Sequence, residues 1–294
     1  GTFDGNVTMA GTITVTGNAD LNGDLDVDGT TNLDAVDVDG AVNFATDVTF
    51  ADGADIITAS AGTSNFRAGV NAGNSIQSGG NYNTVVGDEA GTALTTGDNN
   101  TFIGYASGDA QTVADNNTAV GYEALSTNVN GSASVAIGYR ALKTQNYGSA
   151  TDAFNVAIGN VAGTSITTGT LNTLVGAISG DALTEGTTNC ALGYGTLSAD
   201  TLGSRSTAMG YSSLINQNFT SATNSHNSGF GFFALRSNQT GTDNTACGAY
   251  ALDDNTTGAE NTAVGYESQL NTTTDIRNTT VGVYTLSTNT TGSN

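Results

Sequence analysis

The sequence predicts an all-β protein, an elongated rod in which short parallel strands stack as the coils of a β-solenoid. Three observations support this fold class. Glycines recur every six residues near the start, a five-residue phrase ending in glycine recurs twelve times from residue 83 onward, and helical spacing of apolar residues is sustained nowhere. Repeats of this kind indicate stacked supersecondary units rather than a single globular core.

The composition is unusual for a globular enzyme. Of 294 residues, 37% are apolar and only 11% are charged, with 40 glycines and neither proline nor tryptophan. Valine, isoleucine, leucine and tyrosine nevertheless recur at fixed spacing, which predicts order. The formal charge of −21 argues against nucleic acid and anionic membrane surfaces as partners. Two cysteines cannot build a disulfide framework, and no apolar run reaches the length of a membrane helix.

Residues 1–62 carry a six-residue repeat. Glycines at positions 5, 11, 17, 23 and 29 alternate with apolar pairs such as Val7 with Met9 and Ile13 with Val15. We expect short strands that form a narrow β-helical stem, because six residues cannot enclose a core alone. The segment is acidic, and part of its acidic series is Asp20, Asp24, Asp26, Asp28, Asp34, Asp37 and Asp39. These carboxylates are expected to form a solvated surface, with binding of Ca²⁺ or Mg²⁺ as the alternative.

Residues 63–82 are rich in glycine and are expected to form a neck. From residue 83 to residue 294 the repeat is longer. The glycines that close the phrase fall at 87, 104, 121, 138, 159, 176, 193, 210, 231, 248, 265 and 282. Nine of the steps between successive glycines have a length of 17 and two have a length of 21, so three short steps and one long step make a block that is duplicated. We therefore expect a parallel β-roll of twelve coils, truncated before a further repeat.

Each column of the phrase suggests a role. The residue just before the glycine, here called the apolar column, is apolar in every copy and is expected to face a dry interior. The residue before it, the middle column, is usually alanine and is expected on the opposite face, where another surface approaches closely. The first residue, the asparagine column, predicts a ladder of side-chain hydrogen bonds. After the glycine, segments such as Tyr122-Glu123-Ala124-Leu125 are expected to form a second short strand.

A single coil is too thin to be stable alone. Two or three buried apolar side chains contribute roughly 5 to 8 kcal/mol. Ordering the backbone of one coil costs about 17 kcal/mol or more. Stability is therefore expected to come from neighbouring coils and, through the alanine face, from other chains.

The phrases Asn117-Thr118-Ala119-Val120-Gly121, Ser134-Val135-Ala136-Ile137-Gly138 and Asn155-Val156-Ala157-Ile158-Gly159 resemble the head repeats of trimeric autotransporter adhesins. They also resemble the tandem repeats of bacteriophage tail-fibre proteins, and the hexad segment is similar to the slender β-stems of phage fibres. The likeness covers residues 83 to 294. It implies a left-handed parallel β-roll in which three chains associate around a common axis.

Few residues suggest chemistry. The single histidine, His226, would be needed by a Ser-His-Asp hydrolase, but its counterpart in the first copy of the block is Phe154, so we expect a loop residue without a catalytic role. Cys190 and Cys247 are expected to be small buried apolar residues, since no histidine or further cysteine accompanies them as a metal ligand.

The two longer steps each add four residues and an aromatic ring, Tyr147 in the first and Phe219 in the second. Such rings are expected to plug the space between coils or chains, with stacking on a sugar as the alternative. A column of tyrosines follows the glycine, and stacking along a wall is favoured for it over ligand binding. The tyrosines are Tyr105, Tyr122, Tyr139, Tyr194, Tyr211 and Tyr266.

Together these observations predict a protein that is not an enzyme, with no catalytic, cofactor-binding or metal site. We expect an elongated homotrimeric fibre segment that extends or presents a host receptor-binding tip, located in the virion as part of a phage tail fibre. Its expected partners are its own copies, other tail or fibre proteins, and a host cell-surface glycan or protein. The alternatives are a bacterial trimeric surface adhesin or extracellular filament subunit and, with least support, a glycan-cleaving tailspike.

Overall fold

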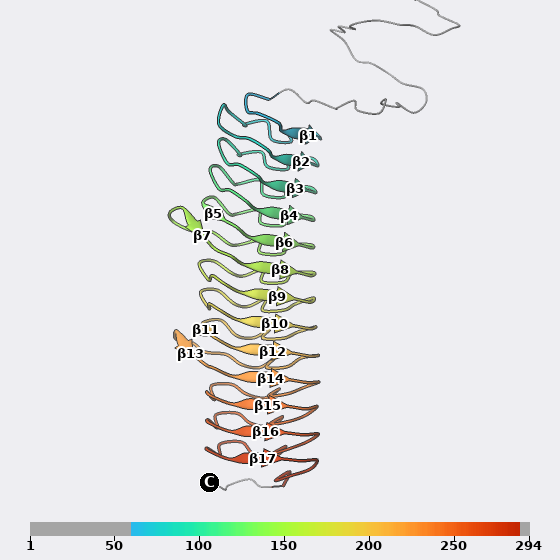
Figure 1. Ribbon diagram of the computed structural model, residues 1–294, viewed down its shortest axis with the longest axis vertical. Coiled ribbons are helices and arrows are strands. Elements are labelled where there is room, and N and C mark those ends of the chain that lie inside the picture. The colour runs from blue at the N-terminus through green and yellow to red at the C-terminus, as the bar shows by residue number, and fades with distance from the viewer. Residues whose placement is uncertain (1–59, 289–294) are drawn as a thin grey trace, which may run out of the picture. The chain divides into compact units, whose positions relative to one another are not determined.

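The structure is a computed structural model, and it describes residues 60–288 of the chain. These residues form a column of stacked coils, one above the next (Figure 1). The six-residue repeat of the stem predicted for residues 1–62 falls outside the described residues, apart from the last three positions of that segment.

The principal sheet contains one three-residue strand from each coil, and all of its strands are parallel to their neighbours. In order, its 13 strands are β1 (Phe66–Ala68), β2 (Thr84–Val86), β3 (Thr101–Ile103), β4 (Thr118–Val120), β6 (Val135–Ile137), β8 (Val156–Ile158), β9 (Thr173–Val175), β10 (Cys190–Leu192), β12 (Thr207–Met209), β14 (Ser228–Phe230), β15 (Thr245–Cys247), β16 (Thr262–Val264) and β17 (Thr279–Val281).

The register of the sheet follows the repeat. Ala119 of β4 pairs with Ala136 of β6, the same position in the next copy of the phrase, and Ala136 pairs with Ala157 of β8 across the first long step. The described chain is therefore a parallel β-solenoid of about thirteen coils, in which most coils repeat at the interval of the short step. At about 4.8 Å per strand, its sheet is about 58 Å long. Strand β1 lies inside the segment predicted as a neck, residues 63–82, and is the first strand of the sheet.

The interior lies under the middle column, and here the prediction was wrong. The side chains of Ala119, Ala136 and Ala157 are fully buried, whereas the apolar column points away from the coil. Where the middle position is alanine or glycine, the opposite wall of the coil is close to it, whereas a larger middle residue such as Phe102 faces the glycines Gly91 and Gly108. A Cβ atom placed on Gly229, which occupies this column, would lie 2.4 Å from Ser213 Oγ and 3.4 Å from Ala234 O. The close surface inferred from alanine is therefore part of the same solenoid, not another chain.

The segment after the glycine forms a turn and not the second strand that was predicted. Glu123 and Leu125 both have left-handed backbone conformations, with φ of 50° and 56°. This alternation of conformations folds the chain back on itself and places the Leu125 side chain in the interior, where it is fully buried. The turn is still bonded to its neighbours, because Glu123 N donates to Tyr105 O and Leu125 N donates to Ala141 O.

The glycine of the phrase is required by both its conformation and its contacts. Gly121 has φ of 134°, a region that side-chain-bearing residues rarely adopt. A Cβ atom at this position would lie 2.5 Å from Gly138 O in the next coil. The spacing between coils therefore leaves no room for any larger residue.

The two longer steps leave the column as protruding loops. Each long step carries one short strand that pairs with a strand of the preceding short step: β7 (Thr151–Asp152) pairs with β5 (Gly131–Ser132), and β13 (Thr223–Asn224) pairs with β11 (Gly203–Ser204). Figure 1 shows β7 and β13 projecting from the side of the column away from the principal sheet. The extra residues are thus accommodated without a change in the register of the main sheet.

Candidate functional site: the outward face of the sheet

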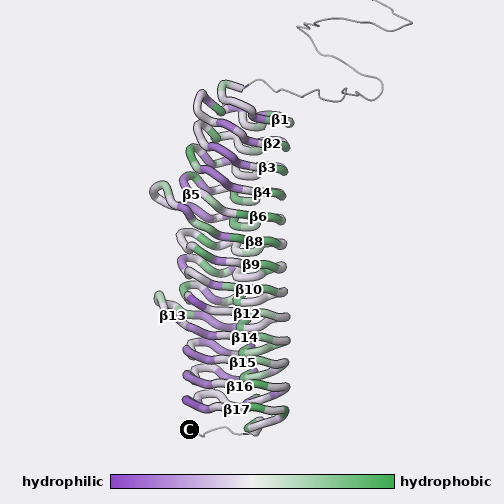
Figure 2. Tube along the Cα trace, viewed as in Figure 1, coloured by the Kyte–Doolittle hydropathy of each residue, from purple (hydrophilic) through white to green (hydrophobic). Residues whose placement is uncertain are grey.

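The principal sheet presents an apolar stripe to the outside. The apolar column supplies it, and its side chains include Ile103, Ile158, Leu192 and Phe230, each between 37% and 43% exposed. Figure 2 shows hydrophobic residues along the strands and the adjoining turn, while the opposite side of the column is more hydrophilic, most clearly in the coils of β14 to β17. A stripe that runs the length of a sheet is far larger than the scattered apolar residues expected on a monomeric surface.

Aromatic rings extend this face along its edge. The rings of Tyr105, Tyr122 and Tyr139 stack with centroids 5.3 and 5.4 Å apart and interplanar angles of about 15°. Tyr194 and Tyr211 repeat the arrangement, and Phe232 continues it. Because the rings lie face to face along the column, they cover one another's faces and leave their edges outward. A sugar would therefore meet ring edges in these stacks. Stacking along the wall is confirmed for these rings, whereas Tyr266 meets Tyr250 and Tyr284 edge to face.

Both cysteines lie on the outward face, contrary to the prediction that they are buried. Cys190 opens β10 and Cys247 ends β15, and both are exposed free thiols. The error follows from the assignment of the columns. The first and last residues of each three-residue strand share one face, and that face is the outer one.

The asparagine column forms a buried ladder, as predicted. In each ordinary coil the side-chain oxygen accepts from the backbone of the next asparagine, as in Asn117 N to Asn100 Oδ1 at 2.9 Å. The amide nitrogen donates to a backbone oxygen of the following coil, as in Asn100 Nδ2 to Ala114 O at 2.9 Å. Both asparagines are fully buried. The ladder therefore satisfies backbone groups of the interior that no strand pairs.

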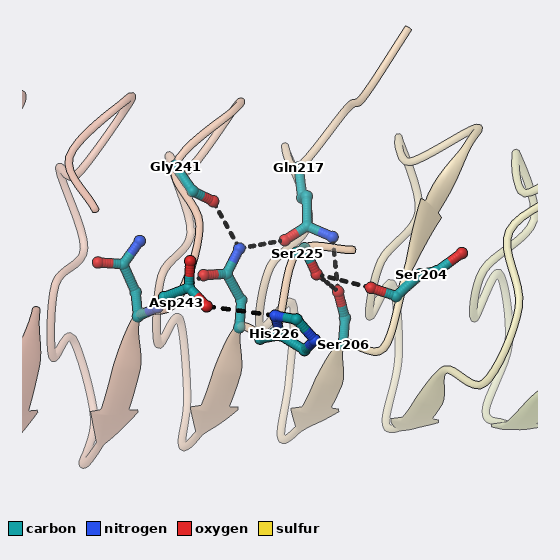
Figure 3. Close-up of polar contacts among 9 residues, drawn as sticks. Ser204, Ser206, Gln217, Ser225, His226, Gly241 and Asp243 are labelled. Atoms are coloured by element: carbon teal, nitrogen blue, oxygen red, sulfur yellow. Dashed lines mark hydrogen bonds and ion pairs between the residues drawn. The ribbon is translucent and has the colours of Figure 1, made fainter. Parts of the chain in front are cut away.

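Serine interrupts the ladder twice, and each time a glutamine restores it. Ser206 replaces asparagine in the coil of the second protruding loop. Gln217 donates from Nε2 to Ser206 Oγ at 2.8 Å and accepts from Asn227 Nδ2 at 2.8 Å (Figure 3). Ser134 and Gln145 repeat this arrangement in the first long coil, where Gln145 Nε2 donates to Ser134 Oγ at 3.1 Å. The serine and the glutamine are separated by the same sequence offset in both cases.

The aromatic rings of the long steps point inward and are buried. Tyr147 is 6% exposed and Phe219 is 5% exposed, so each ring closes the base of its loop and neither forms a platform. The Tyr147 hydroxyl donates to Gly169 O at 2.7 Å and accepts from Asn155 Nδ2 at 3.2 Å. Burial raises the pKa of Tyr147 to about 12. The expectation that these rings fill space is confirmed.

His226 does not form a catalytic triad with its serine neighbour. Its Nδ1 atom lies 3.2 Å from Asp243 Oδ1, and both side chains are about half exposed. The preceding residue, Ser225, is buried and its hydroxyl is bonded to Ser206 and Ser204 (Figure 3). The nucleophile and the base that a hydrolase requires therefore point to different environments.

Three carboxyl groups in the roll are perturbed by burial. Burial raises the pKa of Asp109 to about 6, and it raises that of Asp253 to about 6 although Arg236 lies 2.7 Å from its Oδ2 atom. Burial also raises the pKa of Asp200, which accepts from Gln217 Nε2 at 2.6 Å. Within residues 60–288 no three acidic, histidine or cysteine side chains gather as metal ligands. The acidic series of residues 20 to 39 lies outside the described residues.

The part of the chain that is described, residues 60–288, holds no helix suited to crossing a membrane. In comparisons with known proteins, no family model, no curated protein and no solved structure matches the chain.

Proposed function

We propose that this chain is a non-enzymatic structural segment of a homotrimeric fibre, part of a phage tail fibre that extends or presents a receptor-binding tip. The observation that carries the proposal is the apolar stripe on the outward face, which runs from β2 to β17. A chain with this stripe exposed would aggregate, whereas copies that pack stripe against stripe would bury it. The number three and the viral setting come from the resemblance of the phrase to adhesin and fibre repeats.

The size of the face suits association of whole chains. A strip about 53 Å long and roughly 13 Å wide, the span of four residues along the chain, offers about 690 Å². This area is close to the roughly 800 Å² that one chain buries in a stable pairwise interface, and in a trimer it is divided between two neighbouring chains. Because every coil contributes the same columns, copies that run parallel bury the face along its full length. A stiff rod is the mechanical result.

The mass of the purified protein in solution tests the proposal. Light scattering after size exclusion is expected to give about 88 kDa, three times the 29.4 kDa of one chain. Ile158→Glu places a charge on the outward face and is expected to reduce the mass to that of one chain. The matched control is Thr168→Glu, an exposed position in the same coil on another wall. A wild-type particle with the mass of one or two chains would overturn the proposed trimer.

The native thiols provide a second readout. Cys190 and Cys247 are exposed in a single chain. In the assembly they are expected to resist a maleimide reagent until the protein is denatured, whereas Ile158→Glu exposes both. Rapid labelling of both thiols in the native wild-type protein would contradict packing through this face.

A further inference from the structure

The most exposed large apolar side chains away from the end coils form a pair. Phe154 is 53% exposed and Leu171 is 54% exposed, more than any tyrosine of the stacked column. They are neighbours in adjacent coils, since Leu171 N donates to Ala153 O at 2.8 Å. Phe154 takes part in none of the ring stacks found among residues 60–288. Its ring is therefore available to a ligand.

Polar groups adjoin this pair. Asp152 ends β7 at the base of the first protruding loop and is exposed, while Ala153 between it and Phe154 is buried. Asp152 and Phe154 are thus two exposed side chains on either side of a buried residue. Ser149 and Thr151 lie in the same loop, which Thr151 Oγ1 braces by donating to Ser149 O at 3.0 Å. The buried Tyr147 ring fixes the base of this loop, so the loop and the apolar pair keep their relative positions.

We propose that Phe154, Leu171 and Asp152 form a binding site for one sugar unit of a neutral glycan. The C–H groups of a pyranose ring stack on an aromatic face, and its hydroxyls donate to a carboxylate. The charge of −21 disfavours an acidic glycan. The surface of two apolar side chains is far smaller than the roughly 800 Å² that each partner buries in a stable protein interface. It is comparable in size to the face of one sugar ring.

The second long coil provides an internal control. At the equivalent positions of the second block it carries Asn224, His226 and Asp243. The His226 ring is engaged with Asp243 at 3.2 Å, so this coil has the same backbone without the apolar pair. It is expected not to bind the sugar.

An array of immobilised neutral oligosaccharides, containing glucose, galactose, mannose and N-acetylhexosamine units, tests the site. The wild-type protein is expected to bind at least one of them. The double substitution Phe154→His with Leu171→Asp replaces the apolar pair by the residues of the second coil and is expected to weaken binding at least tenfold, while His226→Ala leaves it unchanged. The reverse transplant, Asn224→Asp with His226→Phe and Asp243→Leu, is expected to double the number of sites per chain.

Three outcomes would overturn the inference: no binding to any neutral oligosaccharide, equal binding by the Phe154 and Leu171 double variant, or binding only to a basic peptide such as oligolysine included on the same array. The inference does not depend on the number of copies in the particle. A particle of three chains that binds no sugar would overturn the sugar site and leave the trimer standing. A protein that binds sugar but has the mass of one chain would overturn the trimer and leave the sugar site standing.

Discussion

Replacing one asparagine of the buried ladder measures what the ladder contributes. Asn172 Oδ1 accepts from Asn189 N at 3.0 Å, and Asn172 Nδ2 donates to Gly186 O at 2.9 Å. Asn172→Ala removes both bonds, together with those that Asn172 makes to the Asn155 and Asn189 side chains, and it leaves a backbone donor and a backbone acceptor buried without partners. Each such group costs about 1 to 3 kcal/mol, so the free energy of unfolding is expected to fall by roughly 2 to 6 kcal/mol. Urea unfolding followed by circular dichroism gives the value.

The control is Asn160→Ala, an exposed asparagine outside the ladder, which is expected to change stability by no more than about 0.5 kcal/mol. A loss at Asn172 as small as this would refute the ladder as a source of stability. Asn172→Ser combined with Leu183→Gln copies the arrangement of Ser206 and Gln217. The pair is expected to show a favourable coupling of about 0.5 to 3 kcal/mol in a double-mutant cycle.

Three further changes test the coil, its charges and its loops. Gly121→Ala forces a side chain to φ of 134° and to 2.5 Å from Gly138 O, so a loss of at least about 1 to 3 kcal/mol is expected, while Gly148→Ala, with no atom within 4 Å, is neutral. Because the Asp109 pKa is about 6 when folded and 3.8 as its ordinary value, the melting temperature is expected to rise as pH falls from 7 to 4, and Asp109→Asn should flatten that rise. Tyr147→Phe removes both hydrogen bonds of the hydroxyl and is expected to cost about 0.5 to 1.5 kcal/mol by urea unfolding, because Asn155 Nδ2 still donates to Gly169 O and Phe219 fills the equivalent place without a hydroxyl.

Repetition made the architecture predictable. A phrase that returns at a fixed interval predicts parallel pairing at that interval, and the pairs of Ala119 with Ala136 and Ala208 with Gly229 follow the copies of the phrase. The ladder was predictable because asparagine is one of the few side chains that both donates and accepts. The burial of Tyr147 and Phe219 was anticipated because a ring beside a four-residue insertion fills the space that the insertion opens.

The direction of the strand faces was not predictable from hydrophobicity. Alanine and the larger apolar residues alternate, and the larger ones were assigned to the core. In a coil this narrow the middle position is alanine or glycine in most copies, as the contacts near Gly229 explain, and Phe102 fits there because Gly91 and Gly108 face it. Ile137 and its equivalents are left outside. Because the two faces of the strand were exchanged, Cys190 and Cys247 were predicted to be buried, whereas both are exposed. The exposed pair of Phe154 and Leu171 was missed because its two members belong to different coils and become neighbours only when the coils stack.

The placement of the two protruding loops one block apart has a genetic consequence. Since each coil touches only the coils before and after it, excising residues 122–193 would join Gly121 to Tyr194 and recreate a junction already present in the molecule. Such an excision would shorten the column by four coils, about 19 Å, and each new neighbour would occupy the same repeat position as the residue it replaces, as Ala208 would in place of Ala136 beside Ala119. The length of the column can therefore differ between related chains in steps of one four-coil block.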